Sequence, residues 1–179
     1  QLPALRIARE MGWYVAAADG NPLADGRDDC DVFYHVDLKD SDGLIRTARE
    51  IRDAGGLDGV FTAGTDFSLS VALVAEALDL PGHRPEAARL ATDKVAMRRC
   101  FRDAGVPSPA FAEIGPGDDA AALAAGVPGS WVVKPVDSMG ARGVIRIDRV
   151  GELEAALAEA RDYSRSGRAL LETYMDGPE

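Results

Sequence analysis

The sequence has little that would support metal, disulfide or membrane chemistry. Its 179 residues contain only two cysteines, Cys30 and Cys100, which are too far apart in sequence for a CxxC pair. Two isolated thiols exclude a disulfide framework or cysteine-based metal site, and they favour a reducing cytoplasm. His35 and His83 also stand alone. No apolar run approaches the roughly 20 residues that a membrane-spanning helix needs, so no membrane partner is expected.

Positive charge is scarce as well, with 20 basic against 30 acidic residues and a net charge of -10. A chain this acidic is not expected to bind nucleic acid or an anionic membrane. A small anionic ligand remains compatible with this charge. Salt screens distant charges within roughly 8 Å, so a few local cations can dominate a pocket.

Several sequence signatures of catalysis are missing, including GxxxxGK[ST], HExxH and GxSxG. Asp19 ends the apolar run "WYVAAAD" (13–19), where dinucleotide-binding folds place an acid for the ribose. No glycine fingerprint precedes it in the sequence. Asp19 followed by Gly-Asn-Pro is equally typical of a turn, which is the interpretation we favour.

Helix-like and strand-like patterns alternate through the first 85 residues. Strands that alternate with helices indicate parallel pairing in an α/β unit. The expected helices cover 3–11, 41–56 and 66–80, and the expected strands cover 13–19, 31–36 and 57–64.

The pattern changes near residue 85, where we place a domain boundary. Two helices are predicted next, and Thr92 is expected to cap the second of them. The remaining pattern indicates an α+β unit with an antiparallel ribbon at 131–147. The helices of this half are expected at 85–91, 93–104, near 118–125 and at 151–165, and its last strand at 169–175.

The ribbon "WVVKPVDSMGARGVIRI" (131–147) holds a lysine, Lys134, at the end of an apolar strand. A partly buried ammonium needs an anion, and phosphate supplies one. At about 4 Å and an effective dielectric of about 20, the attraction is about 4 kcal/mol before desolvation. Gly140 and Gly143 let the following loop approach a ligand, and successive N–H groups can bind an anion. A flexible hairpin without ligand remains the alternative.

Two further segments carry candidate residues. Lys94 follows Thr92 and Asp93 at a predicted helix start, where an isolated lysine would be solvated. Glu172 lies in an apolar strand, and Glu179 follows it by seven residues after a Gly-Pro turn. Such a strand and turn could present backbone groups to a flat base and a carboxylate to hydroxyl groups. A strand edge followed by a loop is the alternative.

Four segments follow one another in the second half of the chain: "TDK" (92–94), "VPSP" (106–109), "VVKPVDSMGARGV" (132–144) and "LLETYMDGPE" (170–179). In this order they resemble the ATP-grasp superfamily, and the upstream half is similar to its pre-ATP-grasp domain. The resemblance implies an α/β fold class. A Rossmann-like pre-ATP-grasp domain at 1–85, with its first strand missing, would precede an incomplete α+β ATP-grasp domain at 86–179, with its C-terminal lobe missing.

The resemblance assigns phosphate contacts to two lysines and a flap. Lys134 looks like the strand lysine that reaches the α-phosphate and the adenine side, and Lys94 matches an upstream phosphate-binding lysine. The loop 137–143 would be a flap over the phosphates, mobile without nucleotide. Its expected contact residues are Asp137, Ser138, Gly140 and Gly143.

The base and the ribose are assigned to the last segment. Glu172 would lie near the adenine amino group, the backbone from Thr173 to Met175 along the ring edge, and Glu179 on the ribose hydroxyls. Tyr174 is expected to pack rather than to contact the nucleotide.

The implied activity is that of an ATP-dependent carboxylate–amine or carboxylate–thiol ligase acting through an acylphosphate. The implied cofactors are ATP and Mg²⁺, and the partners are a small carboxylate and an amine or thiol nucleophile. A homodimer is left open. Magnesium ligands and catalytic groups are expected downstream of Glu179, so we assign none here and expect the 179 residues alone to be inactive. The alternatives are a dinucleotide-binding module, which relies on Asp19, and a non-catalytic ATP sensor.

Overall fold

The structure is a computed structural model that describes residues 2–177 of the chain. It contains two compact units, which divide between Ala88 and Arg89. The division falls within α4 (Pro85–Thr92), whose first residue is the boundary expected from the sequence. Among the residues described, no helix is long and apolar enough to cross a membrane.

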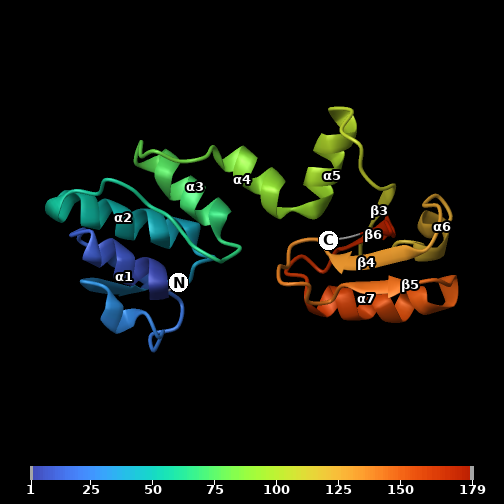
Figure 1. The fold of residues 1–179 in the computed structure, drawn as a ribbon, viewed down its shortest axis with the longest axis horizontal. Coiled ribbons are helices and arrows are strands. Elements are labelled where there is room, and N and C mark those ends of the chain that lie inside the picture. The colour runs from blue at the N-terminus through green and yellow to red at the C-terminus, as the bar shows by residue number, and fades with distance from the viewer. Residues whose placement is uncertain (1, 178–179) are drawn as a thin grey trace. The chain divides into compact units, whose positions relative to one another are not determined.

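The first unit is an α/β arrangement around a parallel pair of strands. Ala16 pairs with Val32 and Asp19 with His35, as the alternating pattern predicted. The carboxylate of Asp19 accepts a hydrogen bond from the Asn21 N–H at 2.8 Å, which confirms the turn. The elements are α1 (Leu2–Glu10), β1 (Ala16–Asp19), the 3₁₀ helix η1 (Arg27–Asp29), β2 (Val32–His35), α2 (Ser41–Gly55) and α3 (Ser68–Ala77) (Figure 1).

The strand predicted at 57–64 is wrong, because this segment has an irregular backbone. Leu57 and Val60 pack against a small core made by Ala48, Val74 and Leu78. A short apolar run identifies a buried segment but does not by itself distinguish a strand from a packed loop. Leu57 and Val60 are partly buried, whereas Phe61 is 58% exposed, so the apolar run did not mark a buried strand.

The second unit is an antiparallel sheet with the strand order β3-β6-β4-β5. Its strands are β3 (Phe111–Ile114), β4 (Trp131–Pro135), β5 (Ile145–Ile147) and β6 (Ala169–Thr173). Its helices are α5 (Lys94–Asp103), α6 (Ala120–Ala124), the 3₁₀ helix η2 (Val150–Glu152) and α7 (Leu153–Asp162). Figure 1 shows α7 running along the sheet beside β4 and β5. The mixed α/β class and the ribbon of β4 and β5 agree with the sequence.

One expected helix cap is wrong. Thr92 is the last residue of α4, and its hydroxyl donates to the Arg89 carbonyl at 3.3 Å. Asp93 caps α5 instead, and its carboxylate accepts from the Ala96 N–H at 2.9 Å. Threonine and aspartate both cap helices well, so residue type alone could not decide between neighbours.

The two faces of this sheet differ, because side chains alternate along each strand. One face carries the main core, in which Ile114, Val133, Ile147 and Leu171 are packed with the α7 side chains of Leu153 and Leu157. On the other face Phe111, Glu172, Val132 and Arg146 form one row across the four strands. Lys134 lies on this second face, opposite Leu170. The apolar run therefore contains a lysine because that position faces away from the main core.

Candidate functional site

Glu172 lies at the centre of the candidate site. Its side chain, on β6, is 5% exposed. Arg98 of α5 donates from Nε to Oε1 at 2.5 Å and from Nη2 to Oε2 at 3.4 Å. The ammonium of Lys134, on the neighbouring strand β4, forms an ion pair with Oε2. One buried carboxylate thus holds two cations from different elements.

Lys94 adds a third cation to this group. It is the first residue of α5, and its N–H donates to the Val136 carbonyl at 3.0 Å. Its ammonium donates to the carbonyl of Ser138, a buried residue in the predicted flap. Lys94 and Arg98 are four residues apart and therefore share one side of α5.

Burial and charge shift the protonation equilibria of this cluster. Burial by itself would raise the pKa of Glu172. Hydrogen bonds from Arg98 and Lys134, together with their charges, outweigh burial and lower that pKa. Burial and the charge of Lys134 lower the pKa of Lys94, although Asp137, Glu172 and Asp93 act in the opposite direction. Lys94 is thus a cation whose charge an added anion would stabilise.

The loop between β4 and β5 needs its two glycines for different reasons. Gly140 and Gly143 have φ values of +73° and +67°, which favour glycine. A Cβ atom on Gly143 would lie 2.8 Å from Cδ2 of Tyr163, so packing also requires this glycine. A Cβ atom on Gly140 would meet nothing within 4 Å, so the backbone there is open to close approach.

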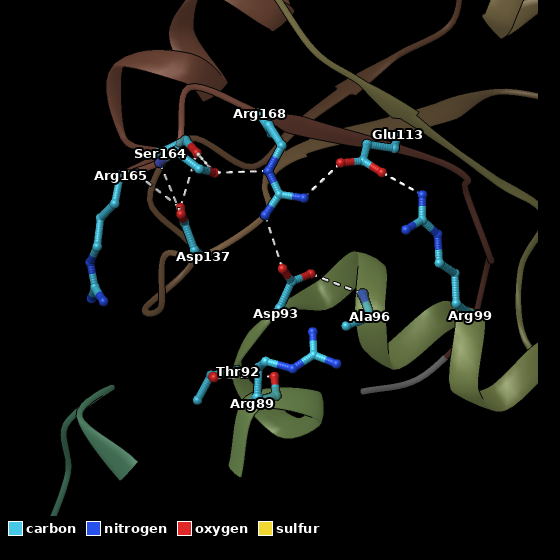
Figure 2. Close-up of polar contacts among 11 residues, drawn as sticks. Arg89, Thr92, Asp93, Ala96, Arg99, Glu113, Asp137, Ser164, Arg165 and Arg168 are labelled. Atoms are coloured by element: carbon cyan, nitrogen blue, oxygen red, sulfur yellow. Dashed lines mark hydrogen bonds and ion pairs between the residues drawn. The ribbon is translucent and has the colours of Figure 1, made fainter. Parts of the chain in front are cut away.

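Asp137 fixes the beginning of this loop. Its carboxylate accepts hydrogen bonds from the Ser164 hydroxyl at 3.0 Å, the Arg165 N–H at 2.9 Å and the Ser166 N–H at 3.0 Å (Figure 2). The expected contact of Asp137 with a ligand stays a prediction. In this structure the side chain connects the flap to the segment between α7 and β6.

A chain of ion pairs connects α5 to the sheet (Figure 2). Arg168 bonds Asp93 at 2.9 Å and Glu113 at 2.6 Å, and Glu113 also bonds Arg99 at 2.6 Å. Asp93 caps α5, Glu113 lies on β3, and Arg168 immediately precedes β6. These contacts hold the helix that carries Lys94 against the sheet that carries Lys134.

Two backbone N–H groups of the segment 172–175, which was expected to contact a base, already make hydrogen bonds within the unit. The Thr173 N–H donates to the Ala110 carbonyl at 2.9 Å, and the Tyr174 N–H donates to the Ser130 carbonyl at 2.7 Å. The guanidinium of Arg146 lies 4.0 Å from the centre of the Tyr174 ring, so this tyrosine packs within the unit. Met175 is 68% exposed and can meet a ligand. Glu179 lies outside the described residues.

The structure thus brings together Lys94, Lys134, Ser138 and Glu172, with Asp137 beside them. Arg98 was missed at the sequence level, because its four-residue spacing from Lys94 on one helix does not show that it reaches Glu172. Within residues 2–177 no group of three or more His, Cys, Asp or Glu side chains could hold a metal ion.

Comparison with known proteins gives relatives along most of the chain, although no family model matches it. The chain is 27% identical over 172 residues to the carbamoyl phosphate synthase large chain of Streptomyces coelicolor. It is 31% identical over 139 residues to a D-alanine–D-alanine ligase of Desulforudis audaxviator. These alignments cover 93% and 74% of the chain but only 16% and 45% of the two relatives. The chain thus spans less than half the length of either one.

Solved structures show the same fold over nearly the whole chain. An L-amino acid ligase from Bacillus licheniformis aligns with a TM-score of 0.73 and 24% identity, over 98% of this chain and 42% of that one. A biotin carboxylase from Campylobacter jejuni, solved as a complex with β,γ-ATP, aligns with a TM-score of 0.68 and 20% identity. That alignment covers 99% of this chain and 43% of the carboxylase. At these identities the likeness establishes the fold alone.

The contacts of Asp137 generate the first prediction. Asp137→Ala removes an acceptor shared by three donors, so the segment 164–166 should open more often. Because a hydrogen bond to a charged group contributes about 1.5–3 kcal/mol, amide exchange at Arg165 and Ser166 should rise by about tenfold or more. Asp118→Ala is the control, since Asp118 accepts from Gly115 at 2.8 Å instead. Unchanged amide exchange at 165 and 166 in the full-length protein would contradict this role of Asp137.

Proposed function

The chain is related to the ATP-grasp ligases, the superfamily to which its relatives and fold neighbours belong. From this premise we propose that it is the ATP-binding portion of an ATP-dependent carboxylate–amine or carboxylate–thiol ligase. The proposal includes an acylphosphate intermediate formed from a small carboxylate. It also takes residues 1–85 as the pre-ATP-grasp domain and 86–179 as the first part of the ATP-grasp domain.

The observation that carries the proposal is the group of three cations around Glu172. Arg98 and Lys134 bond a single buried carboxylate, and the charges of Lys134 and Glu172 both act on Lys94, in a chain with a net charge of -10. Two other acids act on Lys94, but Asp93 bonds Arg168 and Asp137 caps the segment 164–166. Partly buried cations in excess over their direct partners favour an anion, and phosphate is the anion that the glycine loop suits.

The roles proposed for individual residues follow their places in the unit. The ammonium groups of Lys94 and Lys134 neutralise the phosphates and orient them. The flap, with Ser138, Gly140 and Gly143, lies over the phosphates and excludes water. Positioning and charge stabilisation of this kind are the main contributions of proteins to phosphoryl transfer.

The roles at the base and ribose are proposed from the superfamily. Glu172 faces the adenine amino group, the Met175 backbone lies along the ring edge, and Glu179 takes the ribose hydroxyls. The Thr173 N–H is bonded to Ala110, so Thr173 would contribute through its carbonyl. No step is assigned to magnesium, because within residues 2–177 no group of three or more His, Cys, Asp or Glu side chains could hold a metal ion.

Replacing Lys134 tests the site directly. Lys134→Ala should weaken ATP binding by about 1–3 kcal/mol, the scale of a charge-assisted hydrogen bond. Lys39→Ala is a matched control, because Lys39 is an exposed lysine of the first unit and should leave the affinity unchanged. Titration calorimetry on the full-length protein measures both variants. Equal ATP affinity for Lys134→Ala and the parent would refute the proposed site.

The lowered pKa of Lys94 predicts a proton linkage. Phosphate raises the pKa of Lys94, so ADP should bind with proton uptake at pH values between the lowered pKa of the nucleotide-free protein and the raised pKa of the complex. ADP affinity should therefore fall as the pH rises through the pKa of Lys94 in the nucleotide-free protein. Calorimetry in buffers of different ionisation enthalpy, at alkaline pH, measures the protons taken up.

The control for this linkage is Lys94→Arg, because the guanidinium stays protonated across the range. Its ADP binding should take up fewer protons at alkaline pH than binding to the parent protein. Equal uptake by both proteins, or none by the parent, would mean that Lys94 does not titrate against phosphate.

A further inference from the structure

Arg98 is given no ligand contact in the function proposed above, yet it bonds both oxygens of the central carboxylate. We propose that Arg98 is a positioning residue, which keeps Glu172 paired when the Lys134 ammonium moves from Glu172 to a phosphate. This inference rests on the proposed nucleotide site and assigns that site a residue that allows the exchange of partners.

The geometry shows how Glu172 could lose Lys134 without becoming isolated. Arg98 reaches both carboxylate oxygens, Oε1 from Nε at 2.5 Å and Oε2 from Nη2 at 3.4 Å. Lys134 forms its ion pair with Oε2. When Lys134 leaves, both oxygens of Glu172 therefore retain a guanidinium partner.

Burial makes this second partner necessary. The Glu172 side chain is 5% exposed, and those of Lys134 and Arg98 are 18% and 20% exposed. Removing one member of a buried ion pair leaves an uncompensated charge at a large cost. If Lys134 were the sole partner of Glu172, that cost would oppose any transfer of the ammonium to phosphate. Because Arg98 remains paired with Glu172, most of this cost does not arise.

The two residue types suit these two tasks. A guanidinium offers a rigid fork that matches a carboxylate, so Arg98 is suited to stay in place. An ammonium is a compact charge on a flexible stem, so Lys134 is suited to change partners. Arg98 also follows Lys94 by one helical turn, and α5 thereby supplies one phosphate cation and the fixed partner of Glu172.

The neighbouring arginine provides a matched control. Arg99 is on the same helix but bonds Glu113 at 2.6 Å, and its side chain is 56% exposed. Glu113 keeps Arg168 as a partner when Arg99 is replaced. Arg99→Met thus removes a charge and an ion pair from α5 without altering the partners of Glu172.

The test compares ADP with adenosine, because only ADP can draw Lys134 away from Glu172. Calorimetry on the full-length protein measures both dissociation constants for the parent, Arg98→Met, Arg99→Met and the double variant Arg98→Met/Glu172→Gln. Arg98→Met should lower the preference for ADP over adenosine by about tenfold or more, since Lys134 becomes the only partner of a buried carboxylate. Arg99→Met should keep the preference of the parent. The double variant should recover most of that preference, because the neutral amide that replaces the carboxylate releases Lys134.

The outcomes separate this inference from the proposed function. A parent protein that binds neither ligand would overturn both. A parent that binds ADP, with the same preference for ADP in Arg98→Met, would overturn only the role of Arg98. The same holds if the double variant prefers ADP no more than Arg98→Met does. If Arg98→Met does not fold, Arg98→Lys takes its place, because one ammonium cannot span both oxygens and the preference should still fall.

Discussion

The second unit is organised around the carboxylate of Glu172 and its two cationic partners. This group connects β6, β4 and α5, three elements that are distant in sequence. The apolar face of the sheet stabilises the unit through contacts with α6 and α7. The opposite face carries buried charge, which lowers stability unless every group is paired. The pairing fixes where α5 lies, and α5 in turn brings Lys94 to the loop between β4 and β5.

The use of lysine in this group is selective. The chain has three lysines among 20 basic residues, and two of the three, Lys94 and Lys134, lie here. Arginine satisfies the fixed contacts elsewhere, as Arg168 does between Asp93 and Glu113. The proposed exchange of partners by Lys134 accounts for a lysine at that position and for arginines at the fixed contacts.

Local patterns predicted most of the fold, and they failed where tertiary packing decided the outcome. The helices of both units and five of the predicted strands follow hydrophobic spacing, whereas 57–64 is an irregular segment in which Leu57 and Val60 pack on a small core. Lys94, Lys134 and Glu172 were identified because charged residues stand out near an apolar strand or a helix start. Arg98 did not stand out among many arginines, and no sequence feature showed that the Asp137 side chain would bond residues 164–166. Both depend on contacts between residues far apart along the chain.

The central claim is that two of the cations around Glu172, Lys94 and Lys134, receive the phosphates of a nucleotide. The most direct measurement is a crystal structure of the full-length protein with a non-hydrolysable ATP analogue. The claim predicts phosphate oxygens about 3 Å from the ammonium groups of Lys94 and Lys134, as expected for charge-assisted hydrogen bonds, with Arg98 still on Glu172. A nucleotide bound elsewhere, or one bound here with Lys134 still paired only to Glu172, would contradict it.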